Sequence, residues 1–150
     1  MNLPVASQGS KGFTLVELLL ALALMFIVAV FMFPVGLSFY QAQLFRETSD
    51  GILNNLRKAQ NLSVTGKHDS GYGIKILDGS YVHFAGTSYN TRNTAHDEVY
   101  AFPESINVTG LTEIVFEETN GIPSATGTID IVMGARSDRI SIESSGYITR

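Results

Sequence analysis

The 150-residue sequence contains no cysteine, and this absence sets a first limit on its chemistry. Without a thiol the chain forms neither a disulfide nor a thiolate metal site. Its folding therefore does not depend on the oxidation of thiols, whatever the redox state of its compartment.

Charge is also scarce. Only 16% of the residues are charged, and 14 acids against 10 lysines and arginines give a formal net charge of −4. Proteins that bind nucleic acid generally present a basic face. This mildly acidic balance argues against a general nucleic-acid binder.

The three histidines show no pattern of a metal site. His68, His83 and His96 lie far apart in the sequence and lack the spacing of metal ligands. His83 alternates with apolar neighbours, which predicts that it lies on the solvent-facing side of a strand. We therefore expect no metal centre at these residues.

Motifs for catalysis are missing as well. The adjacent acids at 97–98 and 117–118 would point to opposite faces of a strand, which makes a shared acid/base site unfavourable. The glycines form no phosphate-binding loop, and Ser137 lacks the turn of a nucleophile elbow. We predict that the chain is not an enzyme and carries no cofactor. A calcium site in a loop stays open, although the acids match no calcium-loop pattern.

What the sequence does contain is a long apolar run near its start. Leu18 to Leu37 passes without a charged residue. A helix of about 20 residues, at about 1.5 Å each, crosses roughly 30 Å of hydrocarbon. A plain membrane anchor is the simplest interpretation. Pro34 lacks a backbone donor and crowds the preceding turn, so the helix is expected to bend or loosen near Pro34 and Gly36.

One acid, Glu17, lies at the start of this run. An unpaired carboxylate at the edge of a membrane-spanning helix is costly, so such an acid usually has a partner and a function. The alternative is that Glu17 lies at the membrane interface and faces water.

The residues before the run suggest a processing site. Secretory signals place their apolar segment before the cleavage site. Here the polar residues 1–12 precede the apolar segment, and the candidate cut lies between Gly12 and Phe13. Ala21-Leu22-Ala23 offers a conventional site as an alternative, but few apolar residues precede it.

The segment from Lys11 to Glu17 (KGFTLVE) resembles the prepilin motif of type IV pilins and type II secretion pseudopilins. The resemblance implies that a prepilin peptidase and methyltransferase cuts between Gly12 and Phe13 and methylates the new amino group of Phe13. Glu17 then matches the acidic position of the family, and Pro34 matches a position where many pilins carry proline. The resemblance covers about residues 11–40.

The same resemblance implies a mode of assembly. The acid at the position of Glu17 is expected to pair with the amino terminus of a neighbouring subunit. Opposite charges in an apolar setting cost less together than alone, and a buried polar pair can set the register between packed helices. The expected partners are the peptidase, other pilin or pseudopilin subunits and the membrane.

The resemblance also implies a location. The precursor is expected to cross the bacterial inner membrane once, with its leader in the cytoplasm. The mature subunit then joins a periplasmic or cell-surface filament. Many pilins carry a disulfide near the C-terminus, and this chain, which has no cysteine, departs from that habit.

The helix is predicted to continue as an amphipathic segment to residues 62–64, where Thr65-Gly66-Lys67 closes it. Residues 48–51 are expected to interrupt it, because glycine costs about 1 kcal/mol inside a helix and Ser49 or Asp50 can cap a restarted one. Apolar residues then return on one face: Ile52, Leu53, Leu56 and Ala59.

The rest of the chain is predicted to form antiparallel strands. Asp78-Gly79 between two strand-like runs indicates a hairpin. Ile74 and Ile76 are predicted on its buried face, together with Val82 and Phe84. Residues 86–97 are expected to form an exposed loop. The predicted strands are 72–77, 81–85, 98–102, 106–109, 113–118, 128–133, 139–143 and 147–149.

These elements predict an α+β fold of the pilin kind, with a sheet wrapped over the second half of the helix. The expected parts are a cleaved leader (1–12), a membrane and filament-core helix (13–40), its amphipathic continuation (41–64) and a β domain (65–150). Some residues of the β domain also resemble those of H-type minor pseudopilins and FimT-like minor pilins: Phe116, Gly121, Pro123, Ile140-Ser141-Ile142 and Gly146-Tyr147-Ile148.

We therefore predict a structural subunit, a pilin or pseudopilin of the minor kind, in a type IV pilus or a type II secretion filament. One alternative is a minor pilin that presents a ligand- or DNA-binding surface for uptake or adhesion. Another is a membrane-anchored enzyme, which the missing catalytic residues disfavour. Positive charge for DNA binding would come from Arg136, Arg139 and Arg150 in the C-terminal region. The negative charge of Asp130, Asp138 and Glu143 largely offsets it.

Overall fold

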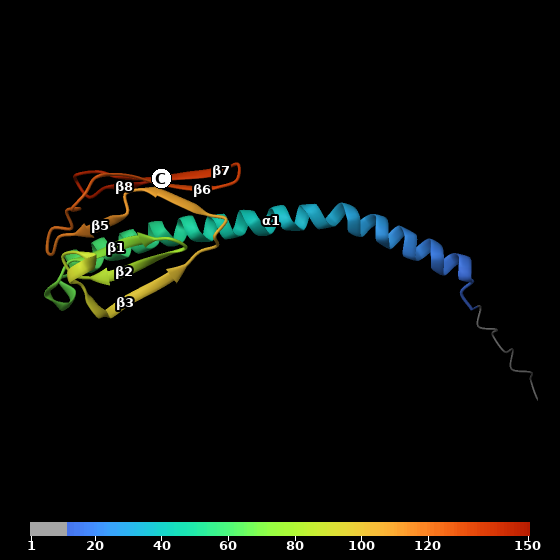
Figure 1. Ribbon diagram of the computed structural model, residues 1–150, viewed down its shortest axis with the longest axis horizontal. Coiled ribbons are helices and arrows are strands. Elements are labelled where there is room, and N and C mark those ends of the chain that lie inside the picture. Colours follow the sequence, from blue (N-terminus) through green and yellow to red (C-terminus); the bar gives the residue numbers. More distant parts are fainter. Residues whose placement is uncertain (1–11) are drawn as a thin grey trace, which may run out of the picture. The chain divides into compact units, whose positions relative to one another are not determined.

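The computed structural model describes residues 12–150. One helix, α1 (Leu15–Val64), is followed by the short 3-10 helices η1 (Lys67–Asp69) and η2 (Tyr89–Thr91) and by antiparallel strands (Figure 1). The second half of α1 packs against the strands, so the predicted α+β class is confirmed. Lys11 and the rest of the leader before Gly12 lie outside the described residues.

The strands form two sheets rather than the single sheet that was expected. The first has the order β3-β2-β1-β5 and the second β4-β6-β7-β8, and all neighbours are antiparallel. The strands are β1 (Tyr72–Leu77), β2 (Ser80–Ala85), β3 (Asn93–Ala101), β4 (Asn107–Gly110), β5 (Glu113–Phe116), β6 (Gly127–Met133), β7 (Arg136–Ile142) and β8 (Ile148–Thr149).

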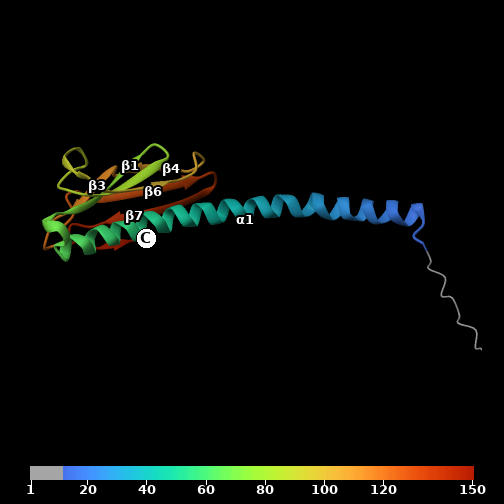
Figure 2. The ribbon, with the colours of Figure 1, turned by 90° about the horizontal axis from the view of Figure 1, so that it is seen from below.

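The chain divides into two compact units, one ending at Gln41 and the other spanning Ala42–Arg150. In the first unit every residue from Gly12 to Gln41 is exposed. In the second, both sheets lie along the second half of α1 (Figure 2).

One core joins that half of α1 to both sheets. Ile52, Leu56 and Ala59 are fully buried, as their spacing of four and three residues along the helix predicts. The sheets meet them with buried isoleucines and aromatics: Tyr72, Ile74, Ile76, Tyr81, Ile114 and Phe116 from the first, and Ile129, Ile131, Ile140, Ile142 and Ile148 from the second.

The predicted interruption at residues 48–51 is wrong, because α1 is continuous there. Ser49 and Asp50 contact residues of the β domain instead of capping a new helix. Ser49 is fully buried and its hydroxyl donates a hydrogen bond to the carboxylate of Asp138 in β7. The carboxylate of Asp50 accepts from the guanidinium of Arg150.

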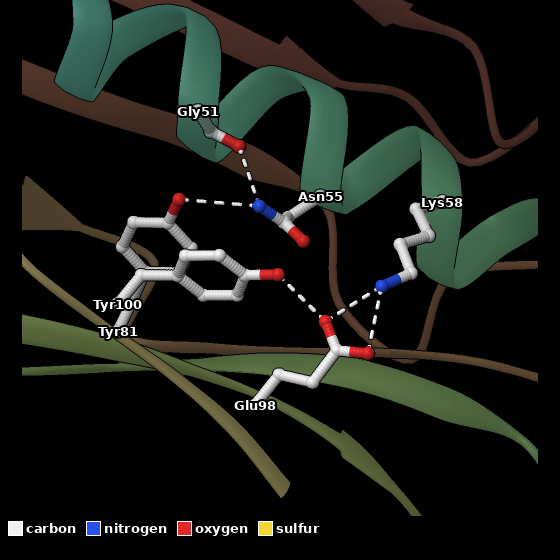
Figure 3. Close-up of polar contacts among 6 residues, drawn as sticks. All are labelled: Gly51, Asn55, Lys58, Tyr81, Glu98 and Tyr100. Atoms are coloured by element: carbon white, nitrogen blue, oxygen red, sulfur yellow. Dashed lines mark hydrogen bonds and ion pairs between the residues drawn. The ribbon is translucent and has the colours of Figure 1, made fainter.

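Gly51 leaves space for Tyr81 of β2, which lies against the helix at this point. A Cβ atom at this position would lie 2.8 Å from the Tyr81 hydroxyl oxygen, closer than such contacts normally allow. The amide of Asn55 donates to the Gly51 carbonyl at 3.0 Å and to the Tyr81 hydroxyl at 3.2 Å (Figure 3). The helical cost of glycine is therefore offset by a buried contact between the helix and the first sheet.

The hairpin of β1 and β2 at Asp78-Gly79 is confirmed, and Gly79 has a φ of 70°, in the left-handed region that favours glycine. The predicted loop 86–97 is partly wrong. It contains η2, and β3 begins at Asn93, where it pairs with Ala85 across an irregularity in β2. These polar residues form a strand because β3 lies at an exposed sheet edge, where no apolar alternation is required.

The predicted faces of β2 are also wrong. His83 is 1% exposed, and it pairs with Ile74, whose side chain belongs to the main core. Residues directly opposite in an antiparallel pair share a face, so His83 lies on the core side. Val82 and Phe84 lie on the other face, where a second cluster with Val115 buries them. Both faces of β2 are covered, so its own sequence pattern could not decide between them.

The end of α1 is tied to two turns of the β domain by Gln60. Its side-chain amide donates to the carbonyl of Gly121 at 3.3 Å and to that of Gly146 at 2.8 Å. Both glycines have positive φ, 66° and 84°. The helix ends at Val64, and Gly66 follows with a φ of 63°, as predicted from Thr65-Gly66-Lys67.

The contact between Gly51 and Tyr81 can be tested with two substitutions. Gly51→Ala should destabilise the natural chain by about 1 kcal/mol, because overpacking against the buried tyrosine outweighs the gain in helix propensity. In a Tyr81→Phe background the hydroxyl is gone, and the same change should become neutral or stabilising. Thermal unfolding of the four proteins in uncharged detergent micelles, followed by tyrosine circular dichroism, measures the coupling. Equal effects of Gly51→Ala in both backgrounds would contradict it.

Candidate processing and assembly site

The candidate site lies at the start of α1, where a side-chain cap fixes the first turn. The hydroxyl of Thr14 accepts a hydrogen bond from the backbone N–H of Glu17 at 3.2 Å, and the Thr14 carbonyl accepts from the N–H of Leu18 at 3.1 Å. Thr14 is therefore the N-cap, three residues before the acid. This is the threonine half of a capping box.

Glu17 lies in the first turn of α1. Its carboxylate is favourable there, because the free N–H groups of a helix start carry partial positive charge. Among the contacts described for residues 12–150, the Glu17 carboxylate accepts no hydrogen bond and joins no ion pair. The side chain is exposed and available to a partner outside this chain.

Gly12 and Phe13, on either side of the predicted cut, are both exposed. A Cβ atom added at Gly12 would meet nothing within 4 Å. Packing within this chain therefore does not require glycine at position 12. A requirement for glycine would come from whatever enzyme acts on the bond.

The helix after this site has an unbroken apolar surface. Large side chains are more than half exposed on all its faces, among them Leu18, Phe26 and Phe33. By length and composition α1 can cross a membrane. It continues through Pro34, whose ring removes the N–H that would bond to the carbonyl of Val30. The bend predicted near Pro34 stays a prediction.

Arg139 and Arg150, which were considered for DNA binding, are paired with acids. Arg139 contacts Asp130, and Arg150 contacts both Asp50 and Asp138. Burial raises the pKa of Asp138, but its hydrogen bonds to Ser49 and Arg150 outweigh this effect and lower the pKa below its usual value. These pairs leave less positive charge on this surface than the sequence suggests.

The structure brings the three histidines together, although they are far apart in sequence. They come from η1, β2 and β3 and line one cavity of about 320 Å³. The rings of His68 and His96 are stacked, with centroids 4.4 Å apart and planes at 11°. Tyr72 lies between His68 and His83. Its hydroxyl is 2.7 Å from Nδ1 of His68, and its ring stacks on the ring of His83 with centroids 5.7 Å apart.

His83 has no hydrogen-bond partner at either ring nitrogen within the described part of the chain. Burial lowers its pKa, as does the positive charge of Lys58 and Lys67, while the negative charge of Glu98 raises it. The net direction is downward, so the folded state favours a neutral ring. No group of three or more metal-ligating side chains is placed to hold an ion in residues 12–150.

Glu98 has two partners beside the cavity. Lys58 donates to it at 2.6 Å, and the hydroxyl of Tyr100 donates to it at 2.6 Å (Figure 3). The hydrogen bond from Lys58 lowers the pKa of Glu98. The hydrogen bond to Glu98 raises the pKa of Tyr100 to about 12. Glu98 is therefore an anion whose charge Lys58 neutralises.

Comparison with known proteins locates the recognisable part of the chain. A family model described as the prokaryotic N-terminal methylation motif matches residues 7–33. No curated protein and no solved structure matches the chain. The chain therefore carries an N-terminal methylation motif on a long apolar helix, which is consistent with type IV pilin-like proteins and supports a processed, membrane-anchored subunit.

Sequence reasoning missed Thr14 and the histidine cavity. Threonine followed by glutamate three residues later, just before an apolar run, is a recognisable helix-start signature and could have identified Thr14. The cavity had no such signal, because it depends on how β2 and β3 pair beside η1.

The buried His83 should make the fold sensitive to mild acid. Its pKa is about 6.5 when unfolded and lower when folded, so its protonation opposes folding as the pH falls below about 6.5. The slope is at most about 1.4 kcal/mol per pH unit for one proton. Unfolding midpoints between pH 7.5 and 5.5 measure it, above the range where Asp138 and Glu98 titrate.

A His83→Phe variant should flatten this slope, because it removes the buried base and keeps a ring of similar size. His96→Gln is the matched control, since it removes a histidine that is exposed rather than buried. Equal slopes in the natural protein and His83→Phe would rule out His83 as the source.

Proposed function

We propose that this chain is a minor pilin or pseudopilin, a structural subunit of a type IV pilus or type II secretion filament. It is cleaved by a prepilin peptidase between Gly12 and Phe13 and methylated on Phe13. The observation that carries the proposal is the methylation motif at residues 7–33, joined to a helix whose apolar surface is exposed as far as Gln41. Lys11 belongs to the same proposed recognition sequence.

The proposed parts follow this role. Residues 1–12 are the leader that is removed, and residues 13–40 are the helix that crosses the membrane and later enters the filament core. Residues 41–64 continue the helix beneath the β domain, and residues 65–150 form the domain that coats the filament. The motif family is structural rather than catalytic, which supports a chain that is not an enzyme.

In this mechanism the apolar helix first holds the precursor in the inner membrane, with its leader in the cytoplasm. After cleavage the helices leave the bilayer and pack against one another in a periplasmic or cell-surface filament. They exchange lipid contacts for protein contacts of similar polarity, so association needs small, specific interactions. Pro34, which removes a helical hydrogen bond, lets the helix bend or extend during the transfer.

Glu17 supplies such a specific interaction. Its carboxylate has no described partner in its own chain, and cleavage creates a new amino group at Phe13 on each neighbouring subunit. The pair fixes the axial register of adjacent helices. Breaking a buried pair by removing one partner costs about 3–5 kcal/mol, because the other charge remains buried alone.

Processing can be tested with Gly12→Val. The branched side chain should block cleavage, so the full precursor accumulates on a gel in cells that have a prepilin peptidase. Gly36→Val is the matched control, because a Cβ atom at Gly36 also meets nothing within 4 Å. Normal processing of Gly12→Val would contradict the proposed cut.

Assembly can be tested with Glu17→Gln. This variant should be cleaved normally but should be lost from sheared filaments, because the neighbour's amino group would stay unpaired. Glu47→Gln, an exposed acid further along α1, is the control and should assemble. Full incorporation of cleaved Glu17→Gln into filaments would disprove the pairing.

A further inference from the structure

The two sheets of the β domain end in four edge strands, and β3 is the longest of them (Figure 1). The edge of β5 is covered, because Phe116 bridges to Pro123 and the N–H of Ser124 donates to the carbonyl of Val115. The strands β4 and β8 have four and two residues, against nine in β3. Within residues 12–150 no strand pairs with the outer side of β3. An open edge of this length can pair with another strand.

Only the second half of β3 is regular. The pairing of β2 with β3 shifts between His83 and Ala85, so residues 94–97 form an irregularity of the kind that protects a sheet edge. From Glu98 to Ala101 each residue has a direct partner in β2. The part of the edge that is open to pairing is therefore the segment 98–101.

The backbone of this segment offers hydrogen-bonding groups to the outside. The N–H of Phe102 donates to the Gly79 carbonyl at 2.9 Å, so Phe102 faces β2. Backbone groups alternate between the two sides of a strand, so Tyr100 also faces β2, whereas Val99 and Ala101 face the open edge. Both of these residues are exposed, and the exposed fraction of Val99 is 66%. An added strand would find two donors and two acceptors here.

A groove of about 470 Å³ lies between this edge and α1, and its lining includes Leu44 and Gly51 of the helix. Tyr100 lines it from β3 and lies opposite Tyr81, whose side chain belongs to the main core, so Tyr100 points to the α1 side of the sheet. The rings of Tyr81 and Tyr100 stack at 5.0 Å beside the helix (Figure 3). Alternate side chains of an added strand would therefore enter this groove.

The charge in the groove indicates which strand it would accept. Glu47 is the one charged residue in the lining, and it is exposed and joins no ion pair within residues 12–150. A second copy pairing through its own β3 would bring only another acidic groove to the contact. A strand that carries a basic residue would instead neutralise Glu47. An apolar residue two positions away would point to the same side, toward Leu44 and Tyr100.

We propose that β3 binds an extended segment of another protein by strand addition. The segment hydrogen-bonds to the backbone of Val99 and Ala101 and places a basic and an apolar side chain in the groove beside α1. Main-chain hydrogen bonds give such a contact its affinity, and the groove gives it specificity. The site lies within Ala42–Arg150, and neither the processing site nor Glu17 takes part in it. It therefore does not depend on the function proposed above.

A peptide array tests the proposal with the full chain in uncharged detergent micelles. The array holds blocked heptapeptides of the form Thr-X-Thr-X-Thr-X-Thr, where each X is Arg, Glu, Gln, Leu or Phe. All X side chains then lie on one side of an extended strand, and every register is sampled. The tightest members should combine an arginine with a leucine or phenylalanine. Exchange of that arginine for glutamate should weaken binding about tenfold, because it replaces attraction to Glu47 with repulsion.

Hydrogen exchange followed by NMR then locates the tightest array peptide. It should slow exchange of the Val99 and Ala101 N–H groups severalfold. The N–H of Val108 is the control, because it faces the open edge of β4: the N–H of Leu111 donates to Thr128 of β6, and alternate residues face away. Exchange at Val108 should not change.

Two variants make the test specific. Val99→Pro removes the N–H that faces the open edge and no hydrogen bond to β2, and edge strands tolerate proline at such positions. It should weaken binding of the tightest array peptide by about tenfold, because a donor is lost. Val99→Thr keeps that N–H and the branched shape of the side chain, and should bind as the natural chain does. Thermal unfolding of both variants checks that they fold.

Four outcomes would overturn the proposal. The first is an array in which no peptide binds more tightly than the member with glutamine at every X. The second is equal affinity after exchange of arginine for glutamate. The third is equal affinity in Val99→Pro and Val99→Thr. The fourth is slow exchange at Val99 and Ala101 that needs no peptide and increases with protein concentration, which would assign the edge to a second copy of this chain.

Discussion

An apolar surface in water must be covered, and this requirement governs the whole length of α1. From Ala42 onward, the chain covers its own helix with two sheets that meet at Ile52, Leu56 and Ala59. From Gly12 to Gln41 the chain provides no cover at all. The first part therefore depends on lipid or on other protein, whereas the second is complete within one chain. The same continuous helix satisfies both conditions by changing its pattern from apolar all round to apolar on one face.

Polar contacts within the β domain refine what apolar packing begins. Asn55, Ser49 and Gln60 each extend from α1 to a different part of the two sheets or their turns. Because each has a specific partner, these side chains fix the rotation and axial position of the helix against the strands. Packing alone tolerates small shifts of this kind. With no cysteine available, such contacts take the place of a covalent constraint.

Local patterns predicted much of this structure. The extent of α1, the β1–β2 hairpin and the later strands follow from periodicity and turn residues close in sequence. The errors at Gly51, Asn93 and His83 have one cause, which is that each conformation is decided by a residue distant in sequence. The Tyr81 hydroxyl leaves space only for glycine at position 51, and pairing with Ala85 of β2 starts β3 at Asn93. Ile74 decides which side of the sheet His83 occupies. The N-terminal motif could be recognised from the sequence because its residues are contiguous. The cavity lined by the three histidines exists only after the sheet has formed.

The amide of Gln60 has a consequence for motion in the domain. One side-chain group holds the carbonyls of Gly121 and Gly146, which belong to turns 25 residues apart in sequence. Each turn has its own hydrogen bond to this amide, so an outward swing of one turn either breaks that bond or pulls the amide away from the other turn. The two turns should therefore open together. A partner that binds one turn should also restrain the motion of the other. Gln60 thus couples two turns that are distant in sequence.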